Sequence, residues 1–433
     1  MSQGLILSVA FLGLGMHPAA WRGRDGAPQD YFDPAFYVEV AKAAEDGLLQ
    51  ALFLADTLAV EEENYERPNL GAMDPAAVLG LLAGATRRIG LVGTASTTYN
   101  EPYSLARRFQ AIDHLSDGRA GWNVVTTFAP TAAANFGTAA LPRSEDRYDR
   151  AEEFVDVVRQ LWLSWRDGAL VGDKAGGVFA DTRHVQPIDH RGKHFSVKGP
   201  ATLPRSRQGH PVLFQSGASG PGRELAARTA DAVFTVKNTL ATALDYRQDL
   251  RRRAVAFGRR PDAIKVLPGL VPIIGATEAE ARARKQRLDE LGGASELRKL
   301  ALRVGVKVED LVLDRPLPFD LIDANADFRG SEGFRSAVVD LARREQLTVR
   351  ELLYHNGGGH LQVVGTPQQV ADTLEQWYRA GAADGFNLAL DMLPEGLYRF
   401  IESVVPLLQR RGLFHTAYEG TTLRQHLGVE TPS

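Results

Sequence analysis

Short apolar segments alternate with amphipathic helical segments along most of this chain, and this alternation restricts the fold more than any other feature. The apolar segments are too short for buried helices and suit strands that are covered on both faces. Strands that alternate with helices form a parallel sheet with right-handed crossovers. We count eight such segments, at residues 5–11, 51–56, 88–96, 119–126, 211–217, 231–236, 264–275 and 385–390.

The expected helices carry start signals that agree with this pattern. Asp-Pro pairs at 33–34 and 74–75 each place a capping carboxylate before a proline at the first helical position. Thr366 and Gln369 form a capping box, and residues 395–411 are predicted to form one long final helix. Eight strand–helix units predict an α/β fold of the (β/α)8 TIM-barrel type rather than an open sheet.

The chain is longer than such a barrel requires. A (β/α)8 barrel takes roughly 250 residues, and this chain has 433. Residues 167–209 are rich in Gly, Pro and His, and residues 291–360 combine irregular helices with acidic residues. We expect one domain over residues 1–433 with these two stretches as insertions, the second a candidate lid over the active site.

Composition excludes several classes of function. The chain has no cysteine, which rules out disulfides, thiolate catalysis and cysteine-ligated metal centres. Its 50 basic and 53 acidic residues give a net charge of −3 without a basic tail, so nucleic acid is not an expected partner. No apolar run approaches the roughly 20 residues of a membrane helix. We therefore expect a cytoplasmic protein that binds no membrane.

Polar residues collect where the expected strands end. In a TIM barrel the active site lies at the carboxyl ends of the strands. Asp56, Thr94, Ser96 and Asn123 fall at three such ends. Each residue also has a structural interpretation, as a turn former, a polar filler of the barrel or a partner for loop backbone.

A Gly-rich turn, "QSGASGPG", follows the fifth strand. Backbone N–H groups and hydroxyls in such a turn converge on an anion near a helix N-terminus, so Ser216, Gly217 and Ser219 are candidate phosphate ligands. An ordinary strand-to-helix turn has the same composition, and the pattern alone leaves both interpretations open.

The histidines do not form a recognisable metal motif. "HVQPIDHRGKH" holds three histidines, but it lacks H-E-x-x-H spacing and a carboxylate cluster, so structural roles are favoured and no metal is expected. His17 and His360 are either loop residues or ligand contacts. G-x-S-x-G, Walker A and G-x-G-x-x-G motifs are also absent. The chain therefore lacks a Rossmann fingerprint of its own.

The segment "SDGRAGWNVVTTFAPTAAANFG" at residues 116–137 closely resembles a known family. Together with "FLADT", "HPAAWR", "RYDRAEEFVDVVRQLW", "IDHRGKHFSVKGP", "GRELAARTADAVFT" and "VGTPQQVADTL", it resembles the flavin-dependent monooxygenases of the bacterial luciferase-like superfamily. The resemblance is strongest to the nitrilotriacetate, dibenzothiophene-sulfone and pristinamycin-synthase monooxygenases. It spans nearly the whole chain and is weakest at residues 291–350.

This resemblance implies a cofactor and partners. The family has a (β/α)8 barrel and uses reduced FMN as a co-substrate, delivered by a separate NAD(P)H:flavin reductase, which agrees with the missing Rossmann fingerprint. It also implies O2, a small organic substrate and a homodimer or homotetramer. By resemblance, the flavin pocket is lined by Asp56, Thr94, Ser96, Asn123 and Tyr148, and the phosphate is held by Ser216, Gly217 and Ser219.

The resemblance implies monooxygenation, in which one oxygen atom enters the substrate and the other leaves as water. C–N cleavage, C–S cleavage and hydroxylation all stay open. His17 is the expected hydrogen-bonding or acid–base group, because imidazole exchanges protons near neutral pH, and His360 is a second candidate. A non-prolyl cis peptide is suggested within Thr94–Ser96. Aromatic walls that keep the site dry are expected from Phe11, Trp21, Phe53 and Trp122.

Three other functions are compatible with parts of the sequence. A deazaflavin (F420)-dependent dehydrogenase shares the barrel but consumes no O2. A metal-dependent barrel hydrolase uses paired histidines at strand ends, which this chain does not show. A non-catalytic flavin-binding protein shows no substrate turnover. The "GRAGWNVVT" segment favours the monooxygenase interpretation over the deazaflavin enzyme.

Overall fold

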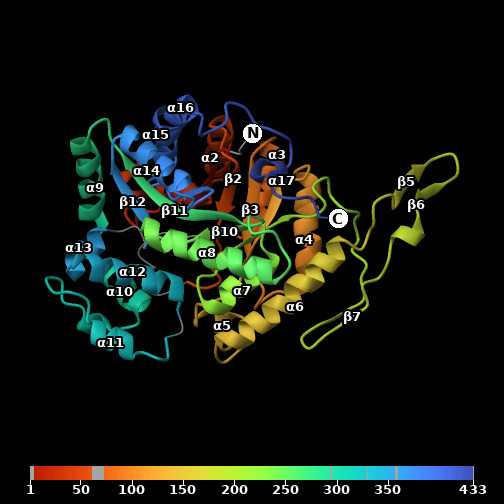
Figure 1. The fold of residues 1–433 in the computed structure, drawn as a ribbon, viewed down its shortest axis with the longest axis horizontal. Coiled ribbons are helices and arrows are strands. Elements are labelled where there is room, and N and C mark those ends of the chain that lie inside the picture. The colour runs from red at the N-terminus through yellow and green to blue at the C-terminus, as the bar shows by residue number, and fades with distance from the viewer. Residues whose placement is uncertain (1–3, 61–72, 293–294, 329, 356–358, 433) are drawn as a thin grey trace.

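The computed structural model describes residues 4–60, 73–292, 295–328, 330–355 and 359–432, and its centre is a closed barrel of eight parallel strands (Figure 1). Each barrel strand lies inside one of the eight expected segments, so the predicted (β/α)8 barrel is confirmed. The eight strands are β1 (Ile6–Phe11), β2 (Ala51–Leu54), β3 (Gly90–Ser96), β4 (Ala120–Val125), β9 (Val212–Gln215), β10 (Ala232–Thr235), β11 (Lys265–Ile274) and β13 (Gly385–Leu388).

The barrel closes between its first and last strands. β1 pairs in parallel with both β2 and β13, and β10 pairs with the first half of β11. The second half of β11 pairs with a ninth strand, β12 (Leu361–Gly365), which runs parallel to it outside the barrel. The sequence pattern did not predict β12, because this segment directly follows the irregular stretch at 291–360.

Helices surround the barrel. The Asp33 carboxylate accepts a hydrogen bond from the Ala35 N–H at 2.8 Å, as its capping role predicts. The single helix expected at 395–411 is two helices, because Pro406 lacks the N–H that an uninterrupted helix needs there. The main helices are α2 (Pro34–Asp46), α3 (Pro75–Ala85), α4 (Pro102–Leu115), α6 (Ser144–Trp162), α7 (Gly220–Thr229), α8 (Leu240–Ala256), α9 (Glu278–Gly292), α14 (Pro367–Arg379), α15 (Glu395–Ser403) and α16 (Val405–Arg410).

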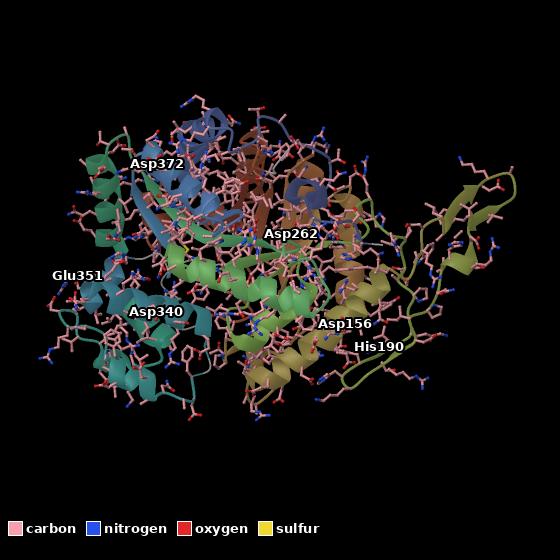
Figure 2. The ribbon with its side chains drawn as sticks, viewed as in Figure 1. Asp156, His190, Asp262, Asp340, Glu351 and Asp372 are labelled. Atoms are coloured by element: carbon pink, nitrogen blue, oxygen red, sulfur yellow. The ribbon has the colours of Figure 1, made fainter. Side chains whose placement is uncertain are left out.

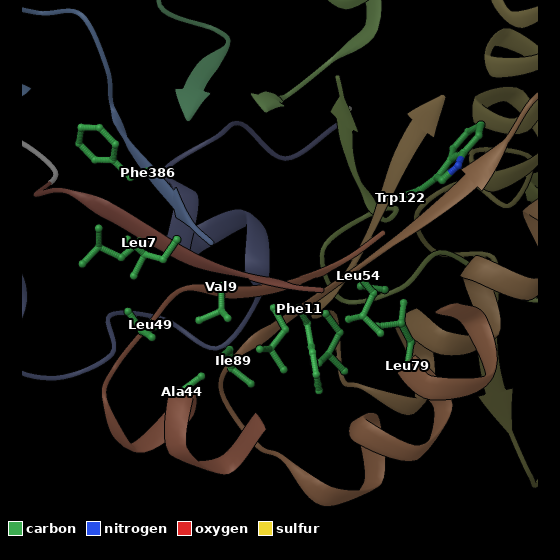
Figure 3. Close-up of a cluster of buried hydrophobic side chains, with 14 of the residues drawn as sticks. Leu7, Val9, Phe11, Ala44, Leu49, Leu54, Leu79, Ile89, Trp122 and Phe386 are labelled. Carbon is green, nitrogen blue, oxygen red and sulfur yellow. The ribbon is translucent and has the colours of Figure 1, made fainter. Parts of the chain in front are cut away.

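The core has two parts because alternate side chains of each strand point to opposite faces. Outward-facing residues such as Leu7, Val9 and Leu54 pack against the surrounding helices (Figure 3). Inward-facing residues fill the barrel, and α17 (Leu423–Leu427) places two leucines in that cluster near the strand starts. The interior cluster is Ile6, Ala51, Phe53, Val92, Val212, Phe214, Ala232, Leu267, Leu423 and Leu427.

The first insertion consists of two hairpins, β5 (Leu170–Asp173) with β6 (Val178–Ala180) and β7 (His190–Arg191) with β8 (Ser196–Val197). The second hairpin contacts α6 through the His190 Nε2–Glu153 Oε1 pair at 2.9 Å and the His194 Nε2–Asp149 Oδ2 pair at 2.6 Å. Figure 2 shows His190 close to α6. Within the described residues, no three His, Asp or Glu side chains converge as metal ligands.

The second insertion is a helical subdomain with a separate apolar core. Its helices are α10 (Ser295–Val304), α11 (Phe319–Ala324), α12 (Glu332–Glu345) and α13 (Val349–Tyr354). Asn238, which follows β10, donates a hydrogen bond from Nδ2 to the Ala337 carbonyl at 3.0 Å. The subdomain therefore contacts the carboxyl end of the barrel.

In the described part of the chain, no helix is both long and apolar enough to cross a membrane.

Candidate active site

A chain of hydrogen-bonded polar side chains crosses three neighbouring strands inside the barrel. Asn123 on β4 donates from Nδ2 to Thr94 Oγ1 at 2.9 Å, and Thr94 is its register partner on β3. Ser216, directly after β9, donates to Asn123 Oδ1 at 3.0 Å. Thr94 and Asn123 are buried. The structure thus brings three of the predicted cofactor residues together at one end of the barrel.

Ser96 lies two residues beyond Thr94 on the same face of β3. Its hydroxyl is 2.7 Å from Thr127 Oγ1 and accepts a hydrogen bond from the Thr98 N–H at 3.0 Å. These bonds hold the ends of β3 and β4 together.

The cis peptide suggested within Thr94–Ser96 was wrong, because the cis bonds of the described residues are Gly199–Pro200 and Leu393–Pro394.

The Gly-rich turn after β9 brings two glycine backbones into contact. A β-carbon on Gly222 would lie 2.8 Å from Gly217 Cα and 3.1 Å from Ser219 Oγ, so no larger residue fits without displacement. Gln215 Oε1 accepts from the Gly217 N–H at 2.6 Å, and Ser219 caps α7 by accepting from the Gly222 N–H at 3.2 Å. We call this turn, residues 215–222, the glycine cradle.

Groups that favour an anion surround the glycine cradle. The hydroxyl of Tyr148, on α6, would lie 2.9 Å from a β-carbon on Gly222. Arg223 and Lys237 stack on the Tyr246 ring, at 5.2 Å and 5.1 Å from its centroid. Burial, reinforced by Arg223, lowers the pKa of Lys237. Arg223 also pairs with Asp249 at 3.2 Å and donates from Nε to the Ala218 carbonyl of the cradle at 2.9 Å. The N-terminus of α7 and Lys237 are therefore the features that make the cradle suitable for a phosphate group.

His360 is buried between the barrel and the helical subdomain. Its ring centroid lies 5.5 Å from that of Phe234 on β10 and 5.7 Å from that of Phe334 on α12. The ring occupies the space that a β-carbon on Gly269 would need. No hydrogen-bond partner of its Nδ1 is found among the described residues. This nitrogen is enclosed, because it faces the Cα of Gly269.

Burial lowers the pKa of His360 to about 3, and Arg303 adds to the effect. His360 is therefore neutral at physiological pH. Below the unfolded-state pKa of a histidine, near 6.5, the unfolded chain binds a proton that the folded chain does not bind. The free energy of unfolding therefore decreases as the pH falls below that value.

We expect His360→Gln to reduce the acid sensitivity of the protein. Between pH 7 and pH 5, the wild type should lose about 2 kcal/mol more of its free energy of unfolding than the variant, because only its unfolded state gains this proton. Urea unfolding at both pH values measures the difference. His114→Gln, at an exposed histidine, should keep the wild-type pH dependence; equal behaviour of the two variants would contradict the expectation.

The sequence of this chain matches a family model described as luciferase-like monooxygenase, over residues 14–384. The chain belongs to the luciferase-like monooxygenase family. It is therefore an enzyme of the monooxygenase class, and the resemblance found in its motifs is confirmed.

Named relatives match this luciferase-like monooxygenase over nearly its full length. Nitrilotriacetate monooxygenase component A of Aminobacter aminovorans is 42% identical, covering 100% of this chain and 97% of the relative. Dibenzothiophene-sulfone monooxygenase of Rhodococcus erythropolis is 38% identical over 95% and 93%, and one subunit of pristinamycin IIA synthase from Streptomyces pristinaespiralis is 42% identical over 97% and 95%. The solved structure of EDTA monooxygenase from Chelativorans sp. BNC1 is 33% identical over 99% of both chains, with a TM-score of 0.82.

His17 of this luciferase-like monooxygenase lies in the loop after β1, which is opposite β9 in the strand order of the barrel, whereas the glycine cradle directly follows β9. Its Nδ1 accepts a hydrogen bond from the Ala19 N–H at 3.0 Å, so Nε2 carries the proton and donates to Asp289 Oδ1 at 3.2 Å. Lys285 contacts the same carboxylate at 2.5 Å. Both ring nitrogens are thus engaged, and the ring is held in one orientation against α9.

Asp56 follows β2 and is half-buried. Burial raises the pKa of this carboxyl to about 6, and repulsion from Asp74 adds to the shift. The shift makes Asp56 a group that changes charge near neutral pH, in contrast to the uncharged Thr94–Asn123–Ser216 chain.

Only some of the expected aromatic walls face the barrel interior. Phe53 does, with its ring centroid 5.9 Å from that of Phe214 and 5.6 Å from that of Phe234. Phe11 and Trp122 do not. Phe11 packs on α2, and Trp122 packs among the helices α4 and α6. The assignment of Phe11 and Trp122 as walls of the active site was wrong. In each strand the adjacent residue points into the barrel, so these two side chains point outward.

Two interior residues were missed in the sequence. Ser8 on β1 donates to Asn387 Oδ1 on β13 at 3.0 Å, and both side chains are buried. The Asn387 amide nitrogen has no partner among the described residues. Asn387 is paired in register with Gly269, whose Cα is covered by His360. The sequence feature that could have indicated this site is Asn387, the single polar residue inside the apolar strand "GFNLAL".

Proposed function

We propose that this luciferase-like monooxygenase is the oxygenase component of a two-component system that uses reduced FMN and O2 to oxygenate a small organic substrate. The observation that carries the proposal is the position of Ser216. It completes the polar chain with Asn123 and Thr94 and directly precedes Gly217 of the glycine cradle. One turn therefore offers hydrogen-bonding groups for a flavin ring edge and a cradle for its phosphate.

The residues present fit FMN at both ends. The Gly217 and Gly222 backbones, Ser219 and Tyr148 would hold the phosphate, with the N-terminus of α7 and Lys237 favouring its charge. Thr94, Ser96, Asn123 and Asp56 would line the flavin ring. The Asn387 amide nitrogen, which has no partner among the described residues, marks where a further polar ligand atom would lie. Bound reduced FMN supplies the electrons with which one atom of O2 enters the substrate and the other leaves as water.

The protein's part in this proposal is to orient, to exclude water and to hold protons. The His17–Asp289 pair keeps the His17 proton on Nε2, and His17 acts as the acid–base or hydrogen-bonding group when Asp289 yields that contact. Neutral His360 adds no charge where the barrel meets the helical subdomain. The helical subdomain serves as the lid, because it covers the turn at Ala218, 2.6 Å from a β-carbon on Gly333.

Partners and substrate are proposed from the relatives' names. The name "component A" implies a second protein, and we take that second protein to be an NAD(P)H:flavin reductase in the cytoplasm. The named substrates include an amine carboxylate and a sulfone, which favours C–N or C–S cleavage, with hydroxylation as the remaining option. We further propose that the enzyme is a homodimer or homotetramer.

Isotope labelling tests the function. The chain is mixed with FMN, NADH, a purified flavin reductase and candidate amine carboxylates or sulfones under ¹⁸O2. One ¹⁸O atom per oxidised product supports the proposal. Hydride transfer to F420 without O2 consumption would instead identify the deazaflavin enzyme, and FMN binding without turnover would indicate a flavin-binding protein.

Asn123→Leu tests the polar chain. It should lower the free energy of unfolding by about 1–3 kcal/mol, because the buried Thr94 and Ser216 hydroxyls lose their shared partner. It should also weaken FMN binding, measured by quenching of flavin fluorescence. Asn135→Leu, at an exposed asparagine on α5 (Ala132–Asn135) whose Nδ2 donates to the Leu58 carbonyl at 3.0 Å, should lose at most about 1 kcal/mol, because this bond is exposed to water. Unchanged FMN affinity in Asn123→Leu would contradict the assigned role.

A further inference from the structure

A groove lies between the second half of α6 and the first insertion. Its wall on α6 includes Asp156 and Arg159, and its wall on the insertion includes Gln186 and Ile188. Figure 2 shows Asp156 on α6 close to His190 of the insertion. The groove has a volume of about 410 Å³, within the roughly 300–1,000 Å³ that is typical of small-molecule sites. We call it the α6 groove.

The α6 groove lies near the amino ends of the barrel strands, whereas the candidate active site lies at their carboxyl ends. Trp162, the last residue of α6, stacks on His210 with ring centroids 5.4 Å apart, and His210 lies shortly before the start of β9. α6 therefore begins on the side of the glycine cradle, with Tyr148, and ends on the side of the groove. A ligand of the groove occupies a site separate from the one proposed for FMN and substrate.

Two arginine side chains in the α6 groove lack a counter-charge. Among the described residues, neither the Arg159 nor the Arg166 guanidinium has a hydrogen-bond or ion-pair partner, and Arg159 Nε is buried without an acceptor. Arg166 is exposed, but Arg159 is half-buried. A guanidinium that is partly withdrawn from water loses hydration, and only an anion offsets that loss.

The carboxylates near the groove are already engaged by other arginines. Asp156 pairs with Arg228 of α7 at 2.6 Å, and Asp231, which follows α7, pairs with the arginine of α17 at 3.2 Å. Arg259 adds positive charge nearby, since burial lowers its pKa and repulsion from Arg159 lowers it further. The region therefore carries an excess of positive charge that an anion in the groove would relieve.

We propose that the α6 groove binds a small organic molecule with two or three carboxylate groups. The planar fork of a guanidinium matches a carboxylate through two parallel hydrogen bonds, and two such forks suit acid groups at two positions of one ligand. Leu163, Pro187 and Ile188 offer apolar surface to its carbon skeleton, and the Gln160 and Gln186 amides offer further hydrogen bonds. A lone phosphate ion would leave the apolar wall in water, which favours an organic acid.

Calorimetric titration of the full-length chain with FMN present tests this proposal. FMN fills the glycine cradle, so an added anion is directed to other sites. The probes are succinate, glutarate and citrate, and the comparison ligands are inorganic phosphate and the uncharged diamide of glutarate. We expect at least one of the three carboxylates to bind at one site per chain and to raise the melting temperature, whereas the diamide should not bind.

Arg159→Gln and Arg166→Gln should each weaken this binding at least tenfold. Arg410→Gln is the matched control, because Arg410 is exposed at the end of α16 and its side chain also has no hydrogen-bond or ion-pair partner among the described residues. Figure 1 shows α16 far from α6. The control should bind the carboxylate as wild type does. Exposed Arg166 keeps the test valid if Arg159→Gln fails to fold.

Three outcomes would overturn the proposal. The first is unchanged binding in both groove variants, and the second is a wild type that binds none of the three carboxylates at millimolar concentration. The third is phosphate binding as tight as carboxylate binding, which would indicate a site for simple anions. FMN affinity and oxygenation are measured separately, so failure of the proposed function would leave the groove's result unaffected.

Discussion

Trp122→Ala is expected to lower the free energy of unfolding by about 3–5 kcal/mol. The indole is fully buried, and its ring centroid lies 6.1 Å from that of Phe109, 5.9 Å from that of Phe154 and 6.2 Å from that of Trp162. Truncation leaves a cavity between β4 and the helices α4 and α6 that close-packed neighbours fill only in part. Urea or thermal unfolding measures the loss.

Trp165→Ala is the matched control for this variant. Both indoles donate to a backbone carbonyl, Trp122 to Ala95 at 3.0 Å and Trp165 to Ala201 at 2.9 Å. Trp165 is only half-buried, so the difference between the variants reports the packed cavity rather than the lost hydrogen bond. Trp165→Ala should lose less than half as much stability. Equal losses would contradict the buried position of Trp122.

Gly222→Ala is expected to weaken FMN binding about 100-fold, or roughly 2.7 kcal/mol. The new methyl group would lie 2.8 Å from Gly217 Cα and 2.9 Å from the Tyr148 hydroxyl, both of which belong to the proposed phosphate site. The cradle must open to admit it, which displaces Gly217, Ser219 and the Tyr148 hydroxyl from their present positions. Fluorescence titration of FMN measures the affinity.

Gly220→Ala separates this steric effect from a change in helix propensity. Gly220 lies in the first turn of the same helix, and a β-carbon there has no atom within 4 Å. Both substitutions favour the helix equally, so Gly220→Ala should bind FMN as wild type does. If both variants bound FMN normally, the glycine cradle would not be the phosphate site.

The barrel was predictable because the sequence patterns that specify its strands and helices each lie within a few consecutive residues. Each strand carries an outward apolar face, and each Asp-Pro pair marks a helix start within a few residues. The site was predictable in part for the same reason, because barrel sites lie at strand ends. The hydrogen bonds among Thr94, Asn123 and Ser216 required the barrel register, because they join residues 29 and 93 positions apart along the chain.

The wrong wall assignments and the contacts that the sequence missed arose where the orientation of one residue or a distant partner decides. Trp122 and Asn123 are adjacent in one strand, so only one of them faces the interior, and the polar residue does so because it has partners there. His17 is paired with Asp289, 272 residues away, which no local pattern indicates. Asn387 was missed because a lone asparagine in an apolar strand is also compatible with a strand end.

The pairing of β1 with β13 has a consequence for synthesis on the ribosome. Ile6–Val9 align with Gly385–Leu388, so the first strand made waits for almost the last before the barrel closes. At roughly 5–20 residues per second, that interval is on the order of 20–80 s. During it, β1 keeps an unpaired edge that is open to wrong partners, and chaperone demand should be greatest for nascent chains shorter than about 390 residues.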